Sequence, residues 1–133
     1  MASPSIPPGL IDTDILIDAQ HGLSEAVAFL TDQQAAGAVQ ISVVSAMELI
    51  AGCRNVSELA LVQQFLQSIT VLPITVTASQ TAYQLMPLFF LSHGLLIPDA
   101  LIAATALDRG LTVYTRNVRH FQMIPGLQVV QPY

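Results

Sequence analysis

Short apolar runs rich in β-branched residues alternate with longer segments of helical spacing along this chain. The pattern predicts strands over residues 9–12, 39–44, 70–76, 111–114 and 127–130. Strands that alternate with helices pair in parallel, because each connection must return across a face of the sheet. We therefore expect an α/β fold of three layers (α/β/α), whose central parallel sheet has four to five short strands.

Start and stop signals of helices lie between these strands. The spacing predicts helices over residues 14–20, 24–36, 45–52, 57–69, 77–92 and 98–109, and a short helix or turn over 116–121. Ser45 and Thr77 each begin a Ser/Thr-x-x-Glu/Gln pattern, so we expect them to cap their helices. We expect Gly37 to end the second helix in a left-handed cap. Pro73 lacks a backbone N–H and places its strand at a sheet edge.

Composition excludes several classes of protein. The 133 residues include nine Asp and Glu, four Arg and no Lys, for a net charge of -5, so no broadly basic nucleic-acid surface is present. The lone Cys53 excludes an internal disulfide and suits a cytoplasmic location. No apolar run reaches the roughly 18–20 residues of a membrane span. Residues 1–8 lack the features of a signal peptide, so we expect a flexible tail before one domain over residues 9–133.

Acidic, amide and hydroxyl side chains lie where the predicted strands end. Asp12 closes the first strand, Glu48 follows the second, and Thr115 and Asn117 follow the fourth. Asp99 begins the helix that leads into the fourth strand. The carboxyl ends of parallel strands meet at one edge of the sheet, where α/β proteins bind ligands. The sequence therefore predicts one site made of oxygen ligands.

Each of these residues also has a local explanation. Asp12 can be a helix N-cap, and Glu48 can complete the capping box that begins at Ser45. Asp99 suits the positive end of its helix, and Asn117 suits a turn. Convergence of all of them at one edge is what distinguishes a functional site from these separate local roles.

Carboxylates that converge need a counterion. Two of them about 4 Å apart repel by roughly 4 kcal/mol at an effective dielectric constant near 20. The chain has no Lys to offset this charge. Oxygen ligands without clustered His or Cys favour Mg²⁺, or Mn²⁺ in its place, over Zn²⁺.

Four blocks of sequence together resemble the PIN-domain family, in particular its VapC-type toxins. They read LIDTDILID, SVVSAMELIAG, PDALIAA and TRNVRHF, and the resemblance runs from Leu10 to the C-terminus. It implies an α/β/α PIN fold and a Mg²⁺-dependent endoribonuclease of a type II toxin–antitoxin pair. It also implies that a cognate VapB-type antitoxin holds the enzyme inactive.

The resemblance assigns roles residue by residue. Asp12, Glu48 and Asp99 match the acidic catalytic residues, with Asp12 and Asp99 expected on the metal. Asn117 matches a fourth catalytic position that is Asp in many relatives, and its missing charge leaves the number of metal ions open. Water made more nucleophilic by the metal would attack phosphorus in line. Two further residues are expected to lie next to the catalytic residues and support them without binding the metal: Asp14 and Thr115.

The few basic side chains are the candidates for phosphate contacts. Surface ion pairs are the alternative role for each arginine. His21 and His93 are expected to be solvated or structural, and Arg109 beside Asp108 structural. Four residues remain as candidates for contact with RNA: Arg116, Arg119, Arg54 and His120.

The expected partners follow from the same resemblance. They are an RNA, such as tRNA or another structured RNA, a second copy in a homodimer, and the antitoxin. Such antitoxins lie across an apolar groove and often place an arginine near the acidic site. The apolar helices 24–36 and 57–69 are candidates to line that groove. An apolar content of 53% also favours a partner that covers part of the surface.

Other acidic α/β families fit less well. Asp12-Thr13-Asp14 also matches the start of haloacid-dehalogenase-type phosphatases, and phospho-receiver domains share an acidic pocket. Both depend on a lysine that this chain lacks. The remaining alternative is a PIN-fold binding or scaffold module with weak or no cleavage, although three mutually repelling carboxylates have no purpose in an inactive site.

Overall fold

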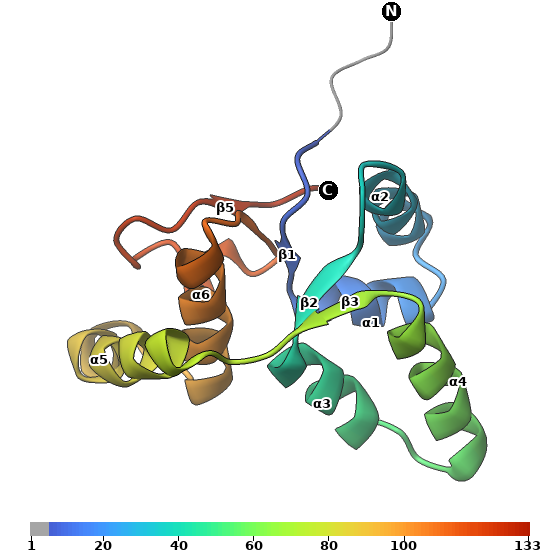
Figure 1. Ribbon diagram of the computed structural model, residues 1–133, viewed down its shortest axis with the longest axis horizontal. Helices are drawn as coiled ribbons and strands as arrows, with labels where there is room; N and C mark the ends of the chain where they lie inside the picture. The colour runs from blue at the N-terminus through green and yellow to red at the C-terminus, as the bar shows by residue number, and fades with distance from the viewer. Residues whose placement is uncertain (1–5) are drawn as a thin grey trace, which may run out of the picture.

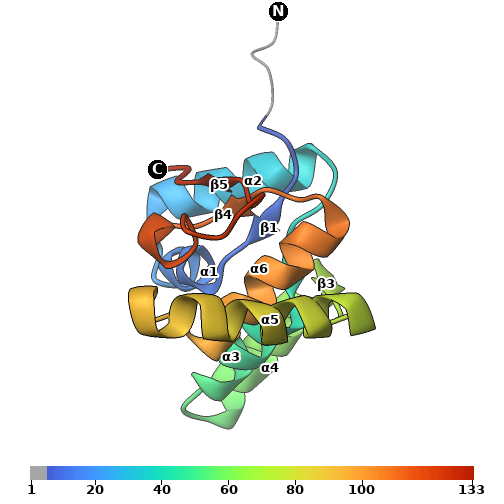
Figure 2. The ribbon, with the colours of Figure 1, turned by 90° about the vertical axis from the view of Figure 1, so that its left-hand side faces the viewer.

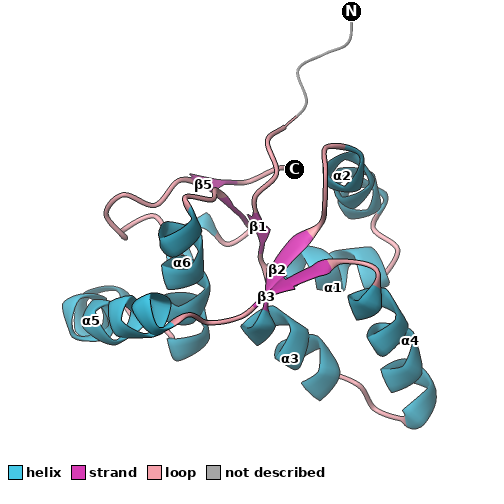
Figure 3. Cartoon of the chain, viewed as in Figure 1, coloured by secondary structure: helices cyan, strands magenta, loops and turns pink. Residues whose placement is uncertain are grey.

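Five parallel strands form one sheet in the computed structural model, which describes residues 6–133. The strand order is β3-β2-β1-β4-β5. Figures 1 and 3 show β1, β2, β3 and β5, and Figure 2 shows β4 beside β1. This confirms the predicted fold class, and β3 lies at an edge as Pro73 predicts. The strands are β1 (Leu10–Ile11), β2 (Gln40–Ser42), β3 (Thr70–Leu72), β4 (Val113–Tyr114) and β5 (Val129–Val130).

Helices cover both faces of the sheet. They are α1 (Thr13–Gln20), α2 (Ser24–Ala35), α3 (Val43–Ala51), α4 (Val56–Gln67), α5 (Val76–His93), α6 (Ile97–Arg109) and the 3₁₀ turn η1 (Val118–His120). The helices α5 and α6 lie on one side, and α1, α2 and α4 on the other (Figure 1). Figure 2 shows α5 crossing the outer side of α6. Within residues 6–133, none of the helices combines the length and hydropathy that a membrane crossing requires.

Successive residues of the central strands serve opposite cores. Leu10 of β1 and Val113 of β4 pack with α5 and α6, whereas Ile11 and Tyr114 pack with α1, α2 and α4. Side chains alternate across a strand, and both faces here are covered by helices. This double burial explains why the strands read as continuous apolar runs, and it fixes the register of β1 beside β4.

The start of α3 corrects a prediction. Ser42, rather than Ser45, caps the helix, and its hydroxyl accepts from the Val44 N–H at 3.1 Å. The β-branched Val43 and Val44 resemble a strand in sequence, but they form the first turn of the helix. Glu48 therefore lies too far along α3 to complete a capping box. Its local explanation is removed.

Other helix ends differ by one or two residues from the predicted ones. Thr75, rather than Thr77, caps α5 by accepting from the Ala78 N–H, and Asn55 caps α4. The left-handed cap expected at Gly37 is wrong, since α2 ends at Ala35 and Gly37 has a φ of 149°. At the starts of α4 and α5, a side chain earlier than the predicted one satisfies a free backbone N–H group.

Close packing fixes the approach to β1. The buried Gln33 of α2 accepts from the Gly9 N–H at 3.2 Å and donates to the Pro7 carbonyl at 3.2 Å. A Cβ added at Gly9 would overlap the Thr112 carbonyl oxygen and the Tyr114 ring. Residues 1–5 of the predicted tail lie outside the described residues.

We predict that Gly9→Ala lowers the free energy of unfolding by about 2 kcal/mol or more, because β1 must move away from β4. Gly52→Ala is the matched control. Gly52 has a φ of −79°, and its added Cβ would have no neighbour closer than 3.5 Å. This control should be neutral or stabilising by about 0.4–1 kcal/mol. Denaturant unfolding measures both, and equal stability of the two variants would contradict the packing argument.

Candidate active site

Asp12 lies at the carboxyl end of β1, directly beside the end of β4. Its N–H donates to the Tyr114 carbonyl at 2.9 Å, which extends the pairing of the two strands by one residue. One carboxylate oxygen, Oδ1, accepts from the Thr13 N–H at 2.8 Å, and Oδ2 accepts from the Thr115 hydroxyl at 2.8 Å. Asp12 is therefore the N-cap of α1, which is the local role that the sequence allowed. It also belongs to a polar cluster.

Asp14 ties the loop after β4 to the first turn of α1. Its Oδ2 accepts from the Arg116 N–H at 2.9 Å and from the Asn117 side-chain amide at 3.2 Å. The Thr115 hydroxyl accepts from the Asn117 N–H at 2.9 Å. That hydroxyl has one proton, and its 2.8 Å distance to Asp12 against 3.3 Å to Asp14 assigns the proton to Asp12. Asp14 and Thr115 thus hold Asp12 and Asn117 side by side.

Glu48 is held by a hydroxyl that the sequence did not single out. Thr13 donates to Glu48 Oε1 at 2.9 Å, and the buried Ser45 hydroxyl lies 2.9 Å from that of Thr13. Because the Thr13 proton goes to the carboxylate, Ser45 donates to Thr13. Ser45 precedes Glu48 by three residues, so the two share a face of α3. The same three-residue spacing also fits a capping box, which is what the sequence predicts.

Asp99 enters the cluster from the first turn of α6. Its Oδ2 lies 3.3 Å from His120 Nδ1, on the 3₁₀ turn η1. His120, predicted to contact RNA, therefore faces an acidic residue of the site. The α6 N-terminus has no side-chain cap, since Leu96 occupies the N-cap position. Asp99 is left with its carboxylate directed into the cluster.

The carboxylates share one electric field. Burial, followed by the charge of Asp14, raises the pKa of Asp12 from 3.8 to about 7, although bonds from Thr115 and Thr13 oppose the rise. Burial also raises the pKa of Asp99, against the influence of His120, and the charges of Glu48 and Asp14 raise it further. The charge of Asp99 contributes to the shift of Asp12 as well. Acidic residues from three helices thus converge, as the strand ends predicted.

The donor set fits a hard divalent cation in its chemistry. Within residues 6–133, no three His, Cys, Asp or Glu side chains stand grouped as metal ligands. Glu48 and Asp14 are instead engaged by hydroxyl and amide donors. Burial, and then the charges of neighbouring carboxylates, raise the pKa values of Asp12 and Asp99. A cation bound beside them would therefore stabilise their ionised forms.

The four arginines occupy different environments. Arg116 pairs with Asp18 at 3.2 Å and lies over the Tyr133 ring. Arg54 pairs with Glu58 at 2.9 Å on another surface, where its side chain is 86% exposed. Arg119 and Arg109 have no ion pair among residues 6–133. Arg116 and Arg119 lie in the loop and 3₁₀ turn around Asn117, beside the acidic cluster.

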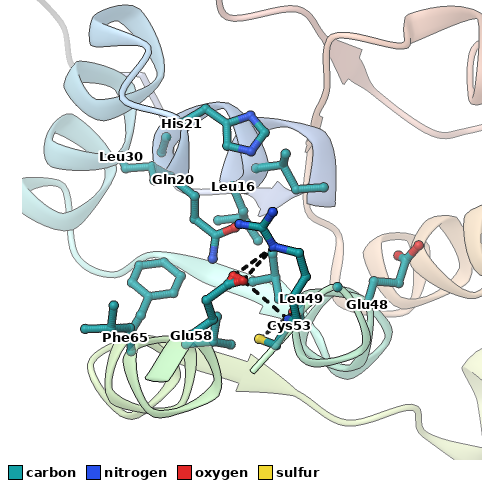
Figure 4. A pocket seen from close by; sticks show the side chains of 15 residues that line it. Leu16, Gln20, His21, Leu30, Glu48, Leu49, Cys53, Glu58 and Phe65 are labelled. Carbon is teal, nitrogen blue, oxygen red and sulfur yellow. Dashed lines mark hydrogen bonds and ion pairs between the residues drawn. The ribbon is translucent and has the colours of Figure 1, made fainter. Parts of the chain in front are cut away.

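An apolar groove of about 700 Å³ lies between α1, α3 and α4 (Figure 4). The predicted helix 57–69 lines it as α4, but the helix 24–36 contributes only Leu30. The rest comes from α1, α3 and the residues that follow each of these two helices. Glu48 lies at one side of the groove with its carboxylate directed away from Glu58 (Figure 4). The apolar lining consists mainly of Leu16, Leu30, Leu49, Leu61, Val62 and Phe65. The groove therefore adjoins the acidic site.

The fold and the acidic cluster at its sheet edge define a known class. The family model described as PIN domain matches residues 9–126, and the chain belongs to the PIN-domain family. It is 38% identical to Ribonuclease VapC10 of Mycobacterium tuberculosis over 120 residues, 90% of each chain. Ribonuclease VapC19 of the same organism is 36% identical over 121 residues, 90% of this chain and 96% of the relative.

Solved structures agree with this family. The chain superimposes on one from a toxin–antitoxin complex of Klebsiella pneumoniae with a TM-score of 0.76 and 32% identity, covering 94% of this chain and 98% of that one. A chain of DNA-bound VapBC from Salmonella typhimurium gives a TM-score of 0.80 at 24% identity, covering 96% and 100%, and supports the fold alone. The resemblance seen in the sequence is confirmed.

We predict that Asp12→Asn stabilises the metal-free protein near neutral pH. The folded state holds the Asp12 proton more tightly than the unfolded state, so the free energy of unfolding falls as pH rises from about 4 to about 7. The shift corresponds to at most about 4 kcal/mol. Asn still caps α1 and carries no charge.

Denaturant unfolding in EDTA at about pH 5 and about pH 8 tests this. The stability gain of Asp12→Asn should appear mainly at the higher pH. Asp32→Asn, at an exposed position of α2, is the control and should change little at either pH. If Asp12→Asn is less stable than the wild type at both pH values, the folded state does not disfavour the ionised form of Asp12.

Proposed function

We propose that this protein is a metal-dependent endoribonuclease, the toxin of a VapBC-type toxin–antitoxin pair. The observation that carries the proposal is the convergence of Asp12, Glu48 and Asp99 at the carboxyl edge of the sheet, with raised pKa values at both aspartates. The identity to two ribonucleases of the VapC type supports it. Divalent-metal dependence is a general property of PIN-domain ribonucleases.

Asp12 and Asp99 would hold the cation, for which we propose Mg²⁺ with Mn²⁺ as a substitute. A bound cation supplies Lewis-acid chemistry by offsetting charge on the phosphate and making a nearby water more acidic. Thr115 keeps Asp12 in place through its hydroxyl, and Asp14 orients the Asn117 amide. Asn117 can donate to a phosphate oxygen without adding negative charge beside a polyanion.

Glu48 is suited to accept a proton from the attacking water. It is exposed to solvent, and Thr13 fixes only its Oε1. Among the described residues its Oε2 has no hydrogen-bond partner, so this oxygen is free to meet a water molecule. The hydroxyls of Ser45 and Thr13 limit rotation of the carboxylate, which reduces the entropy lost when it meets the substrate.

Cleavage of RNA tests this function. We predict that wild-type protein with Mg²⁺ cuts RNA to give 5′-phosphate and 3′-hydroxyl ends. Asp12→Asn and Asp99→Asn should each lower the rate beyond the roughly 10–100-fold that loss of a supporting partner costs. Asp108→Asn is the matched control, since Asp108 is exposed on the same helix as Asp99.

Two results would contradict this proposal in different ways. Unchanged cleavage by both site variants would remove the acidic residues from the mechanism. Absence of cleavage by folded wild-type protein, tested on structured RNAs including tRNA, would favour the alternative of a PIN-fold binding module.

We propose a cognate VapB-type antitoxin as the partner that covers the apolar groove. The similar chain from Klebsiella pneumoniae comes from a toxin–antitoxin complex, which supports a partner of this kind. Leu61 is 67% exposed in the groove. Exposure of this apolar side chain to water is unfavourable in free energy, and a partner that covers it would remove that penalty. A segment lying there would end beside Glu48, where its arginine could meet the carboxylates. A homodimer and a cytoplasmic location remain predictions.

We predict that Leu61→Glu abolishes co-purification with the VapB-type protein encoded by the adjacent gene, because it puts a charge into an apolar contact. Val76→Glu is the control. Val76 is 77% exposed at the first position of α5 and lies outside the groove. Retention of the partner by Leu61→Glu in a co-expression pull-down, with both variants folded, would remove the groove from the interface.

A further inference from the structure

A second hollow, of about 540 Å³, lies beside the acidic cluster and is lined by basic side chains. It is formed where the end of α5, the loop and 3₁₀ turn after β4, and the segment after β5 meet. The polar side chains that line it are His93, Arg116, Asn117, Arg119, His120 and Gln131. Two of the four arginines and two of the three histidines of the chain therefore gather at one place.

This gathering runs against the charge of the whole molecule. The chain carries a net charge of -5 and has no Lys. Among the described residues that line the hollow there is no Asp or Glu. A strongly acidic protein that handles an RNA must offset repulsion locally, and clefts lined by one sign of charge focus the field on a ligand of the other sign.

Two of these basic groups are already engaged by the protein. Arg116 is paired with Asp18 and lies over Tyr133, and His120 faces Asp99. Both side chains are therefore held by contacts within the protein and have fewer free donors for a ligand.

The other two basic groups keep donors for a ligand. Arg119 has no hydrogen-bond or ion-pair partner among residues 6–133, so its guanidinium is free. The His93 Nδ1 lies 2.7 Å from the Ser92 hydroxyl, and the ring packs edge-on against Phe89. This fixes the ring and leaves its Nε2 without a partner in the described part of the chain. Groups from α5 and from η1 can thus act together on one anion.

The hollow is continuous with the acidic site. Asn117 lines the hollow and donates to Asp14, and His120 lines the hollow and faces Asp99. A strand whose reacting phosphate lies at the carboxylates would place a neighbouring phosphate among the basic side chains. Acidic and basic side chains would therefore follow one another along a bound RNA strand. Such an arrangement orients the RNA as well as attracting it.

We propose that this hollow binds a backbone phosphate of RNA adjacent to the one that is cut, with Arg119 and His93 as its main contacts. The proposal rests on the proposed function for the identity of the polyanion. It also assigns His93, expected from sequence to be solvated or structural, to substrate binding. Arg54 does not line this hollow, and it is instead paired with Glu58 at the apolar groove.

The test compares Arg119→Gln and His93→Gln with Arg109→Gln. Arg109 is a matched control because it is exposed, lacks an ion pair in residues 6–133, and lies at the far end of α6, roughly 15 Å along the helix from Asp99. Arg109→Gln changes the net charge by the same amount as Arg119→Gln. Thermal unfolding and circular dichroism establish that each variant is folded.

We expect Arg119→Gln to raise KM for cleavage of an unstructured RNA oligonucleotide about tenfold, with a much smaller change in kcat. The slope of log affinity against log salt should become shallower by about 0.7, the value for one phosphate contact on a single strand. Arg119→Lys should restore most of the affinity. His93→Gln should act in the same direction, and Arg109→Gln should leave KM and the salt slope unchanged.

The same titrations in an Asp12→Asn background, by fluorescence anisotropy with the labelled oligonucleotide, separate the two proposals. Loss of binding with Arg119→Gln but not Arg109→Gln supports the hollow even when cleavage fails. Equal affinity and equal salt slopes for these two variants would overturn the inference, although cleavage by the wild type would still support the proposed nuclease.

Discussion

The pairing of β1 with β4 is the contact on which the site depends. The pairing extends one residue past β1, through the bond from the Asp12 N–H to the Tyr114 carbonyl, and so brings the Asp12 carboxylate to the Thr115 hydroxyl. The strands are only two residues long, so their register is set by packing on both faces and by the lack of a side chain at Gly9. A shift of one residue would exchange the two cores and carry Asp12 away from Thr115.

Opposite charges are separated over a short distance around this pair of strands. The carboxylates come from the starts of α1 and α6 and from α3, whereas the free Arg119 and His93 come from η1 and the end of α5. Helix starts favour acidic groups and helix ends favour basic ones, so the direction of each helix contributes to the pattern. An acidic chain without Lys can in this way present a basic surface at one place only.

Much of this could be predicted from the sequence, because alternation of strands and helices fixes the topology and strand ends fix where side chains meet. Asp12, Asp99 and Asn117 were found on that basis. Thr13 and Ser45 were missed because their role is a contact between α1 and α3, which no local pattern reports. The pattern at Ser45 was predicted as a capping box because Ser45 fits that local role in sequence. Its contact with Thr13 depends on how α3 packs against α1, which the sequence pattern does not report.

The raised pKa of Asp12 links the stability of the fold to its ligands. Burial of this carboxylate beside Asp14 and Asp99 costs free energy near neutral pH, and the two bonds from Thr13 and Thr115 recover only part of it. Any positive charge that binds at Asp12 in the folded state alone both restores stability and lowers this pKa. A cation and a partner's basic side chain would draw on the same unbalanced field, so their binding would be mutually exclusive wherever they approach the same carboxylate oxygens. Competition of this kind would control the site without any change of fold.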